Sequence, residues 1–316
     1  MKIVIPGGTG QLGRVLVGAL RSHGHEIVVL SRDAPPGAGI VRWDGRHQGN
    51  WGREIDGADA VINLAGRSVN CRYNKTNLQQ MMDSRVDSTR AVGIAIQNAV
   101  RPPRVWLQMS TATIYSHRFD AGNDEFDGRI GGEEPDAPSY WRFSIDIAQA
   151  WERTLCDALT PVTRKVALRT AMLMSPNPGG TFSVFLKLVR WGLGGTVAGG
   201  HQYISWIHDR DFVRAVDFLL EREDLTGPVN LAAPGSLPHR DFMAALRAAW
   251  GGSVGLPFPK WMMEIAAFFH RTDTELILKS RRVVPTRLLE AGYTFEFPQW
   301  PPAARDLVAR SRAWAA

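Results

Sequence analysis

A glycine-rich turn near the N-terminus constrains the fold of this chain more than any other feature. Glycines stand at positions 7, 10 and 13, in the spacing G-x-x-G-x-x-G, directly after the apolar segment Lys2–Pro6. Apolar residues then recur at helical spacing over Leu12–His23, and Gly24 is a typical helix terminator. A tight turn and a close approach of helix to strand both need residues without side chains. The pattern predicts a strand, a tight turn and a helix that packs against that strand.

The rest of the N-terminal half repeats this alternation of strand and helix. Further apolar segments predict strands at Glu26–Leu30, Ile40–Trp43, Ala58–Leu64, Arg104–Ser110 and Val166–Met172. Helical spacing predicts helices at Asn77–Asn98 and Ser144–Leu159. Strands that alternate with helices are typical of an α/β fold with a doubly wound parallel sheet, the Rossmann type. Ligands bind this architecture at the carboxyl ends of the strands.

The pattern changes after residue 176. Helices are predicted at Phe182–Trp191, Asp209–Arg222 and Arg240–Trp250, a short strand at Val229–Ala232, and proline and aromatic residues accumulate from about Gly255. We predict a Rossmann domain over residues 1–235, with insertions of a substrate lobe after residue 176. A smaller C-terminal α/β lobe is predicted over residues 236–316.

Composition narrows the class of protein. Hydrophobic residues make up 44% of the chain, which allows a large core, yet no apolar run reaches the roughly 18 residues of a membrane span. The two cysteines, Cys71 and Cys156, form no disulfide framework, and no signal peptide is recognisable. We therefore expect a cytoplasmic protein that does not enter a membrane.

The net charge of +6 raises the question of whether the protein binds nucleic acid. The arginines are scattered, and Arg281-Arg282 is the only basic cluster. A nucleic-acid footprint should be a patch or a stripe, so we expect no nucleic-acid partner. A mildly basic surface favours small anionic ligands instead.

The glycine turn is also the predicted ligand site. The N-terminus of a helix after such a turn offers free N–H groups and a positive dipole end to a pyrophosphate. The residues expected to contact a dinucleotide there are Gly7, Gly8, Thr9, Gly10, Gln11, Leu12 and Gly13.

The end of the second strand predicts which dinucleotide binds. It reads Leu30-Ser31-Arg32-Asp33. Arg32 can offer a charged fork to a 2′-phosphate and Ser31 a hydroxyl, which favours NADP(H). If the strand ended one or two residues later, Asp33 could instead bind the ribose diol of NAD(H).

Several motifs together resemble a known family. The glycine pattern, Asn63-Leu64-Ala65-Gly66 and Ser110 resemble the extended short-chain dehydrogenase/reductase superfamily. A closer resemblance is to its atypical "epimerase family protein" group, some of whose bacterial members carry a cell-division-inhibitor-like label. The motifs that carry it are Ser31-Arg32, Ser84-Arg85, Trp151-Glu152, Leu168-Arg169-Thr170, Ser205-Trp206-Ile207-His208, Gly227-Pro228-Val229-Asn230 and the C-terminal stretch Leu276–Phe297.

The resemblance implies further contacts to NADP(H). They come from the glycines at 7, 10 and 13, from Ser31 and Arg32, and from the segment Leu64, Ala65 and Gly66. Arg85 is implied as a second cation near the adenosine phosphate, and Gln80 shares its environment. Asp44 could accept a hydrogen bond from the adenine amine, or could be an ordinary loop carboxylate.

The usual catalytic pair of the superfamily is missing. No Tyr-x-x-x-Lys occurs: Tyr140 is followed four residues later by Ser144, and alignment on Trp151-Glu152 puts Ser144 and Ala148 at the two positions. Ser110, Tyr115, His208 and Asp209 are the candidate substitutes, with Ser110 to polarise a carbonyl and Tyr115 to supply a phenol. Each has a structural alternative: Ser110 as a cap of its strand, Tyr115 as packing beneath a loop, His208 as a partner of the backbone. The tryptophans Trp141, Trp191 and Trp206 either line a substrate cleft or pack in the core.

Two functions remain open on the sequence. The first is an NADP(H)-dependent oxidoreductase or epimerase-like enzyme acting on a small polar or nucleotide-linked substrate. The second is a non-catalytic protein that senses NADP(H) or interacts with a protein partner, which the missing pair favours.

Overall fold

A parallel sheet of seven strands forms the centre of the computed structural model, which describes residues 1–33, 35, 37, 39–69, 71, 73–134, 138, 141–257 and 278–313. The strand order is β10-β6-β5-β4-β1-β2-β3, and every neighbouring pair is parallel. The strands are β1 (Lys2–Pro6), β2 (Glu26–Ser31), β3 (Ile40–Arg42), β4 (Ala60–Asn63), β5 (Val105–Thr111), β6 (Arg164–Thr170) and β10 (Gly227–Leu231). The predicted doubly wound α/β fold is confirmed, and the chain reverses its direction of winding between β1 and β4, where ligands bind such sheets.

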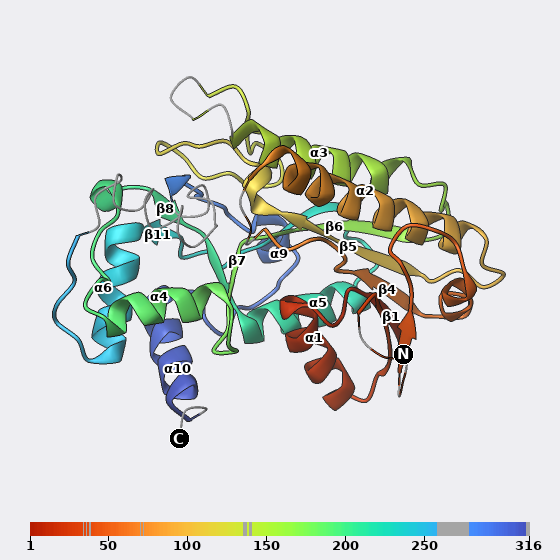
Figure 1. The fold of residues 1–316 in the computed structure, drawn as a ribbon, viewed down its shortest axis with the longest axis horizontal. Helices are drawn as coiled ribbons and strands as arrows, with labels where there is room; N and C mark the ends of the chain where they lie inside the picture. The colour runs from red at the N-terminus through yellow and green to blue at the C-terminus, as the bar shows by residue number, and fades with distance from the viewer. Residues whose placement is uncertain are drawn as a thin grey trace.

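Helices cover both faces of the sheet. On one face α1 (Gln11–Ser22) packs against α5 (Asp209–Glu221), and on the other α2 (Lys75–Gln97) packs against α3 (Arg142–Asp157) (Figure 1). The core side of α1 consists of Gly13, Leu16, Val17 and Leu20, which recur at helical spacing. Because both faces are covered, strands such as β1 are continuous apolar runs, with Ile3, Val4 and Ile5 fully buried.

A second lobe lies beside the carboxyl ends of the strands (Figure 1). It contains α4 (Thr181–Arg190), α6 (His239–Trp250) and α10 (Trp300–Ala313), with two small sheets, β7 (Met172–Met174) with β9 (Trp206–His208) and β8 (Tyr203–Ile204) with β11 (Leu237–Pro238). Trp206 and Trp300 meet edge to face in its core, with ring centroids 5.0 Å apart. Trp206 therefore packs in a core, whereas Trp191 is 62% exposed. The other elements of the described residues are the 3₁₀ turns η1 (Asn50–Glu54), η2 (Ala112–Ile114) and η4 (Ala198–Gly200) and the short helix α9 (Thr286–Glu290).

The two cores are interleaved along the sequence. Leu288, Tyr293 and Phe295, from beyond the predicted boundary at residue 235, pack in the same core as the strands of the main sheet. Met174 and Phe182, from before that boundary, pack with Phe242, Trp300 and Leu307 in the second core. Each lobe is thus completed by residues from the other half of the chain.

Two element boundaries differ from the sequence prediction, one where a strand changes its pairing and one where a helix is capped. The segment predicted as one strand, Val166–Met172, is divided at Ala171, whose N–H bonds to the carbonyl of Leu231. Met172 then pairs with Trp206 in the second lobe. Helix α2 begins earlier than expected, because the Asn74 side chain caps it by accepting the N–H of Asn77.

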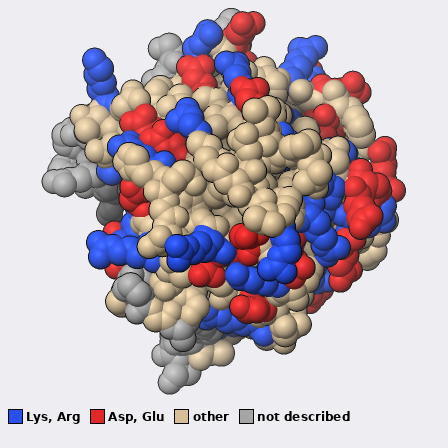
Figure 2. All heavy atoms as spheres, turned by 90° about the vertical axis from the view of Figure 1, so that its right-hand side faces the viewer, with Lys and Arg blue, Asp and Glu red and all other residues tan. Residues whose placement is uncertain are grey.

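Surface charge is mixed on the face seen in Figure 2. Basic and acidic side chains alternate there around a central uncharged area, so this face has no stripe of one sign. Within the described part of the chain, no helix has both the length and the apolar character that a membrane span requires.

Candidate functional site

The glycine turn is closely packed against the loop after β4. Gly7 has φ +77°, and a Cβ there would lie 2.8 Å from the backbone of Ala65. A Cβ on Gly13 would collide with the carbonyl oxygen of Gly8, so the first turn of α1 can pack against the glycine turn only with glycine at this position. Gly10 is the N-cap of α1, and no side chain caps the helix. The helix N-terminus is therefore built as the predicted phosphate site requires.

The end of β2 carries the residues that the sequence predicts for an adenosine phosphate. Ser31 is the last residue of the strand, 3% exposed, and its Oγ lies 3.2 Å from Oγ1 of Thr9. Arg32 and Asp33 follow and are both exposed. Because the strand ends at Ser31, Arg32 occupies the first position beyond it.

Asn63 holds the loop after β4 in place. Its Oδ1 accepts the N–H of Ala65 at 3.0 Å, and its Nδ2 donates to Oε1 of Gln108 at 3.0 Å. The N–H of Leu64 bonds to the carbonyl of Pro6, so Leu64, Ala65 and the glycine turn form one edge.

Arg85 lies against this edge from α2. A Cβ on Gly66 would lie 3.4 Å from the guanidinium carbon of Arg85, and that carbon is 5.0 Å from the centroid of the Trp151 ring. Its Nη1 donates to the carbonyl of Met81. Burial lowers the pKa of Arg85 to about 10, and no carboxylate among the described residues pairs with it. A half-buried cation in this position, with no carboxylate partner in the described part of the chain, suits an anionic ligand. Gln80, five residues earlier, is exposed.

Asp44 closes its own turn. Its carboxylate accepts the backbone N–H groups of Arg46 and His47 and lies 2.6 Å from Nδ1 of His47. The backbone hydrogen bond from His47 leads the effects that lower its pKa to about 2. In this structure the side chain has the role of the loop carboxylate that the sequence left as an alternative.

A buried polar network connects the two candidate catalytic residues. The Oγ of Ser110 donates to Oε1 of Glu152 at 2.6 Å, and Glu152 accepts two hydrogen bonds from Arg169, at 2.9 and 2.8 Å. Arg169 also donates to the hydroxyl of Tyr115, which in turn donates to Oδ1 of Asn230 at 2.9 Å. Tyr115 is 1% exposed, and burial raises its pKa. Both hydrogen-bonding functions of the phenol are thus used inside the protein.

The two positions of the missing catalytic pair lie on α3 and differ in burial. Ala148 is fully buried in a small apolar cluster with Ala112 and Ile114. Ser144 lies half-buried on α3, and Tyr140 lies outside the described residues.

No role was predicted for Glu152, Arg169 or Asn230, although all three stand in the motifs that carried the resemblance. The available signal was the placement of Arg169 near the end of an otherwise apolar strand, where a charged residue needs a buried partner.

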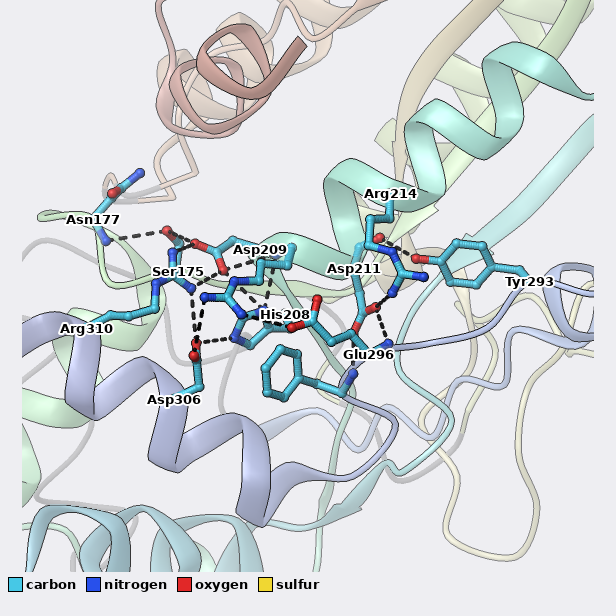
Figure 3. Close-up of polar contacts among 12 residues, drawn as sticks. Ser175, Asn177, His208, Asp209, Asp211, Arg214, Tyr293, Glu296, Asp306 and Arg310 are labelled. Carbon is cyan, nitrogen blue, oxygen red and sulfur yellow. Dashed lines mark hydrogen bonds and ion pairs between the residues drawn. The ribbon is translucent and has the colours of Figure 1, made fainter. Parts of the chain in front are cut away.

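His208 and Asp209 belong to an ionic cluster at the junction of the lobes (Figure 3). Nδ1 of His208 accepts the N–H of Arg210, so Nε2 carries the ring proton and donates to Asp306 at 3.0 Å. The ring stacks on Phe297 at a centroid distance of 3.9 Å, and burial lowers its pKa. The cluster faces α10, so it joins the C-terminal helix to the start of α5.

Comparison with known proteins agrees with this architecture. Residues 3–232 match the model of the NAD dependent epimerase/dehydratase family, and residues 258–307 match a domain of unknown function. The chain is 30% identical to human epimerase family protein SDR39U1 over 314 residues, covering 98% of this chain and 100% of the human protein. It is 26% identical to epimerase family protein YfhF of Bacillus subtilis over 313 residues, with 98% of each chain covered.

Solved structures are similar over the same length. The crystal structure of human SDR39U1 (isoform 2) with NADPH superposes with a TM-score of 0.84 at 28% identity, covering 98% of this chain and 99% of the human one. A UDP-N-acetylglucosamine 4-epimerase from Bacillus cereus shares the fold, with a TM-score of 0.76 at 17% identity, covering 99% of each chain. The resemblance inferred from the motifs is confirmed: the chain belongs to the NAD dependent epimerase/dehydratase family, and within it to the relatives called epimerase family proteins.

Proposed function

We propose that this protein binds NADP(H) and acts as an atypical oxidoreductase or epimerase-like enzyme on a small polar or nucleotide-linked substrate. The observation that carries the choice of cofactor is the end of β2 at Ser31, which gives Arg32 and not Asp33 the first position beyond the strand. The relative human SDR39U1 was crystallised with NADPH, which supports the same choice. Side chains at Gly7 and Gly13 would meet backbone atoms, so the tight turn into α1 needs these glycines, and such a turn supports a pyrophosphate site at the helix N-terminus.

Each cofactor-contacting region then has a defined role. The N-terminus of α1 binds the pyrophosphate, and Ser31 and Arg32 bind the 2′-phosphate. Arg85 supplies the second cation, and its lack of a carboxylate partner among the described residues supports a phosphate ligand. The bound cofactor supplies the hydride, and the protein supplies its position and the proton.

Proton transfer is the difficult step for this site. Tyr115 can donate to a substrate only after its hydrogen bond to Asn230 breaks. The hydroxyl proton of Ser110 is directed to Glu152, so Ser110 can polarise a substrate carbonyl only after that hydrogen bond breaks. We therefore expect slow turnover or a narrow range of substrates.

A second candidate function is a protein that binds NADP(H) without turnover. The specific observation in its favour is the fully buried Ala148 at the position of the usual lysine. No cation on that helix position can then orient the ribose or lower the pKa of a proton donor.

The experiment that tests cofactor binding compares NADPH and NADH by fluorescence titration. Arg32→Ala should weaken the binding of NADPH by about 1–3 kcal/mol, the scale of one charge-assisted contact, and leave the binding of NADH unchanged. Arg85→Gln should act in the same direction. Arg53→Ala removes an exposed arginine of η1 and serves as the control. Equal losses of affinity for NADPH and NADH in Arg32→Ala would contradict the assignment of the 2′-phosphate site.

Turnover separates the two functions. NADPH oxidation is followed with a panel of aldehydes, ketones and nucleotide-linked sugars. The sugars of the panel are also analysed for epimerised products, because an epimerase consumes no net NADPH. NADPH oxidised in proportion to a substrate, or an epimerised sugar, supports the enzyme, and tight NADPH binding without either supports the binding protein.

A further inference from the structure

A loop from the second lobe lies against the glycine turn. The side chain of Gln11, the first residue of α1, reaches Gly180, where an added Cβ would lie 2.0 Å from its Nε2. Gly180 is the N-cap of α4 and ends the segment that starts at Ser175. The segment 175–180 therefore covers one side of the predicted cofactor site.

The start of this segment is held by a buried carboxylate. Ser175 is fully buried, and its Oγ donates to Oδ2 of Asp209 at 2.9 Å. The same Oγ accepts the N–H of Asn177 at 3.4 Å. Asp209 thus fixes the direction in which the chain leaves β7.

Asp209 in turn depends on a cation from the C-terminal helix. It is 5% exposed, and both of its oxygens accept hydrogen bonds from Arg310 of α10, each at 2.8 Å (Figure 3). Arg310 also lies 3.2 Å from Asp306, the partner of His208. A buried carboxylate that loses its cation is strongly destabilised, so without Arg310 the contacts of Asp209 must rearrange.

We propose that Arg310 is a positioning residue for the cofactor site: through Asp209 and Ser175 it holds the segment 175–180 against Gln11. The inference rests on the proposed function, since Gln11 belongs to the predicted cofactor turn. Under this proposal the C-terminal helix α10 has a role in cofactor binding. This helix overlaps the segment that matches the domain of unknown function. Arg310 touches no substrate and no cofactor in this scheme.

The first measurement is hydrogen exchange of the cofactor-free protein. Arg310→Gln should raise exchange of the amides of 175–181 about tenfold or more, while β1 and β5 stay protected. Arg312→Gln is the matched control, because Arg312 lies on the same helix and its contacts among the described residues are with the carbonyl and the ring of Trp250. Arg310→Lys should give an intermediate result, since lysine keeps the charge and loses the two-pronged geometry.

The second measurement is a double-mutant cycle on NADPH affinity. Arg310→Gln and Gln11→Ala should each lower the affinity for NADPH. The loss in Arg310→Gln should be about tenfold. If Arg310 acts through Gln11, the double variant binds within about threefold of the weaker single variant, because the second change removes a contact already lost. A purely structural role of Arg310 predicts losses that multiply.

Three results would overturn the proposal. They are unchanged exchange of 175–181 in Arg310→Gln, exchange that rises equally across β1 and β5, or NADPH losses that multiply in the double variant. A wild-type protein that does not bind NADPH would instead remove the proposed function, and the exchange data would still decide whether Arg310 holds the segment.

Discussion

Gly10 and Gly13 share one motif but meet different neighbours. A Cβ on Gly10 would be 3.3 Å from one carbonyl oxygen, and its φ of −68° suits any residue. A Cβ on Gly13 would be 2.4 Å from the backbone of Gly8. We therefore expect Gly10→Val to keep the fold and lose NADPH binding, because the added side chain occupies the phosphate position. Gly13→Ala should lower the stability of the apo protein itself.

The two variants are compared by thermal unfolding followed by circular dichroism, and by NADPH titration. Undiminished NADPH affinity in Gly10→Val would mean that the turn has only a structural role. An unchanged melting temperature in Gly13→Ala would contradict the close contact between Gly13 and the backbone of Gly8.

His239 predicts a specific pH dependence of stability. It is 1% exposed, Nδ1 has no hydrogen-bond partner among the described residues, and burial lowers its pKa to about 4 from 6.5. Between these values the unfolded chain binds a proton that the folded chain does not, so stability falls as the pH falls below 6.5. The loss attributable to this residue is about 3 kcal/mol at pH 4.

The measurement is urea unfolding at pH 7 and pH 4 of wild type and His239→Phe, whose ring suits the contact with Phe185. The variant should lose less stability than wild type between the two pH values. His201→Phe, at an exposed position, should follow wild type. Parallel curves for wild type and His239→Phe would show that His239 titrates normally.

At the scale of single residues, the sequence predicted backbone geometry better than it predicted the hydrogen-bond partners of side chains. The tight glycine turn was predictable, and so was the end of β2 to within one residue, because both depend on local backbone geometry. Tyr115 was chosen for its place after β5, yet its partners Arg169 and Asn230 come from strands far along the chain. No local pattern indicates that a phenol will be buried and fully hydrogen-bonded.

Between elements, Tyr115 connects the turn after β5 to β6 and β10. Tyr115→Phe leaves the Nη1 of Arg169 and the Oδ1 of Asn230 buried without this partner. We expect a loss of about 1–3 kcal/mol in the free energy of unfolding, the cost of unsatisfied buried polar groups. NADPH affinity should not change.

Urea unfolding and NADPH titration test this prediction, with Tyr203→Phe as the control, because no hydrogen bond to the Tyr203 hydroxyl is found among the described residues. If Tyr115→Phe keeps its stability but loses turnover on a substrate found in the panel, the phenol is the proton donor.

The presence of the strands was predicted more accurately than the residues at which they begin and end. The apolar runs of β1, β2, β4 and β5 stand out, because helices cover them on both sides. The division between β6 and β7 was missed because the segment 166–172 is apolar apart from Arg169 and Thr170, and the pairing of Met172 with Trp206 is what separates the two strands. Tertiary pairing decided that boundary.

Across the whole molecule, the interleaved cores predict a single cooperative unfolding transition. Phe295 and Leu288 complete the core of the main sheet, and Met174 and Phe182 complete the core of the second lobe. Neither half of the chain, cut at residue 235, contains a full core. A chain of two independent domains would instead unfold in two steps.

Calorimetry with and without NADPH tests this organisation. We expect one transition whose calorimetric and van't Hoff enthalpies agree, and a shift of that whole transition to higher temperature with cofactor. At a free NADPH concentration one hundred times Kd, the stabilisation should be about 2.7 kcal/mol, because only the folded protein binds. The ionic cluster of His208, Asp209, Asp306 and Arg310 joins the lobes, so the second lobe should be stabilised together with the cofactor site. Two transitions, of which only one moves with NADPH, would show that the lobes fold independently and that the cluster does not couple them.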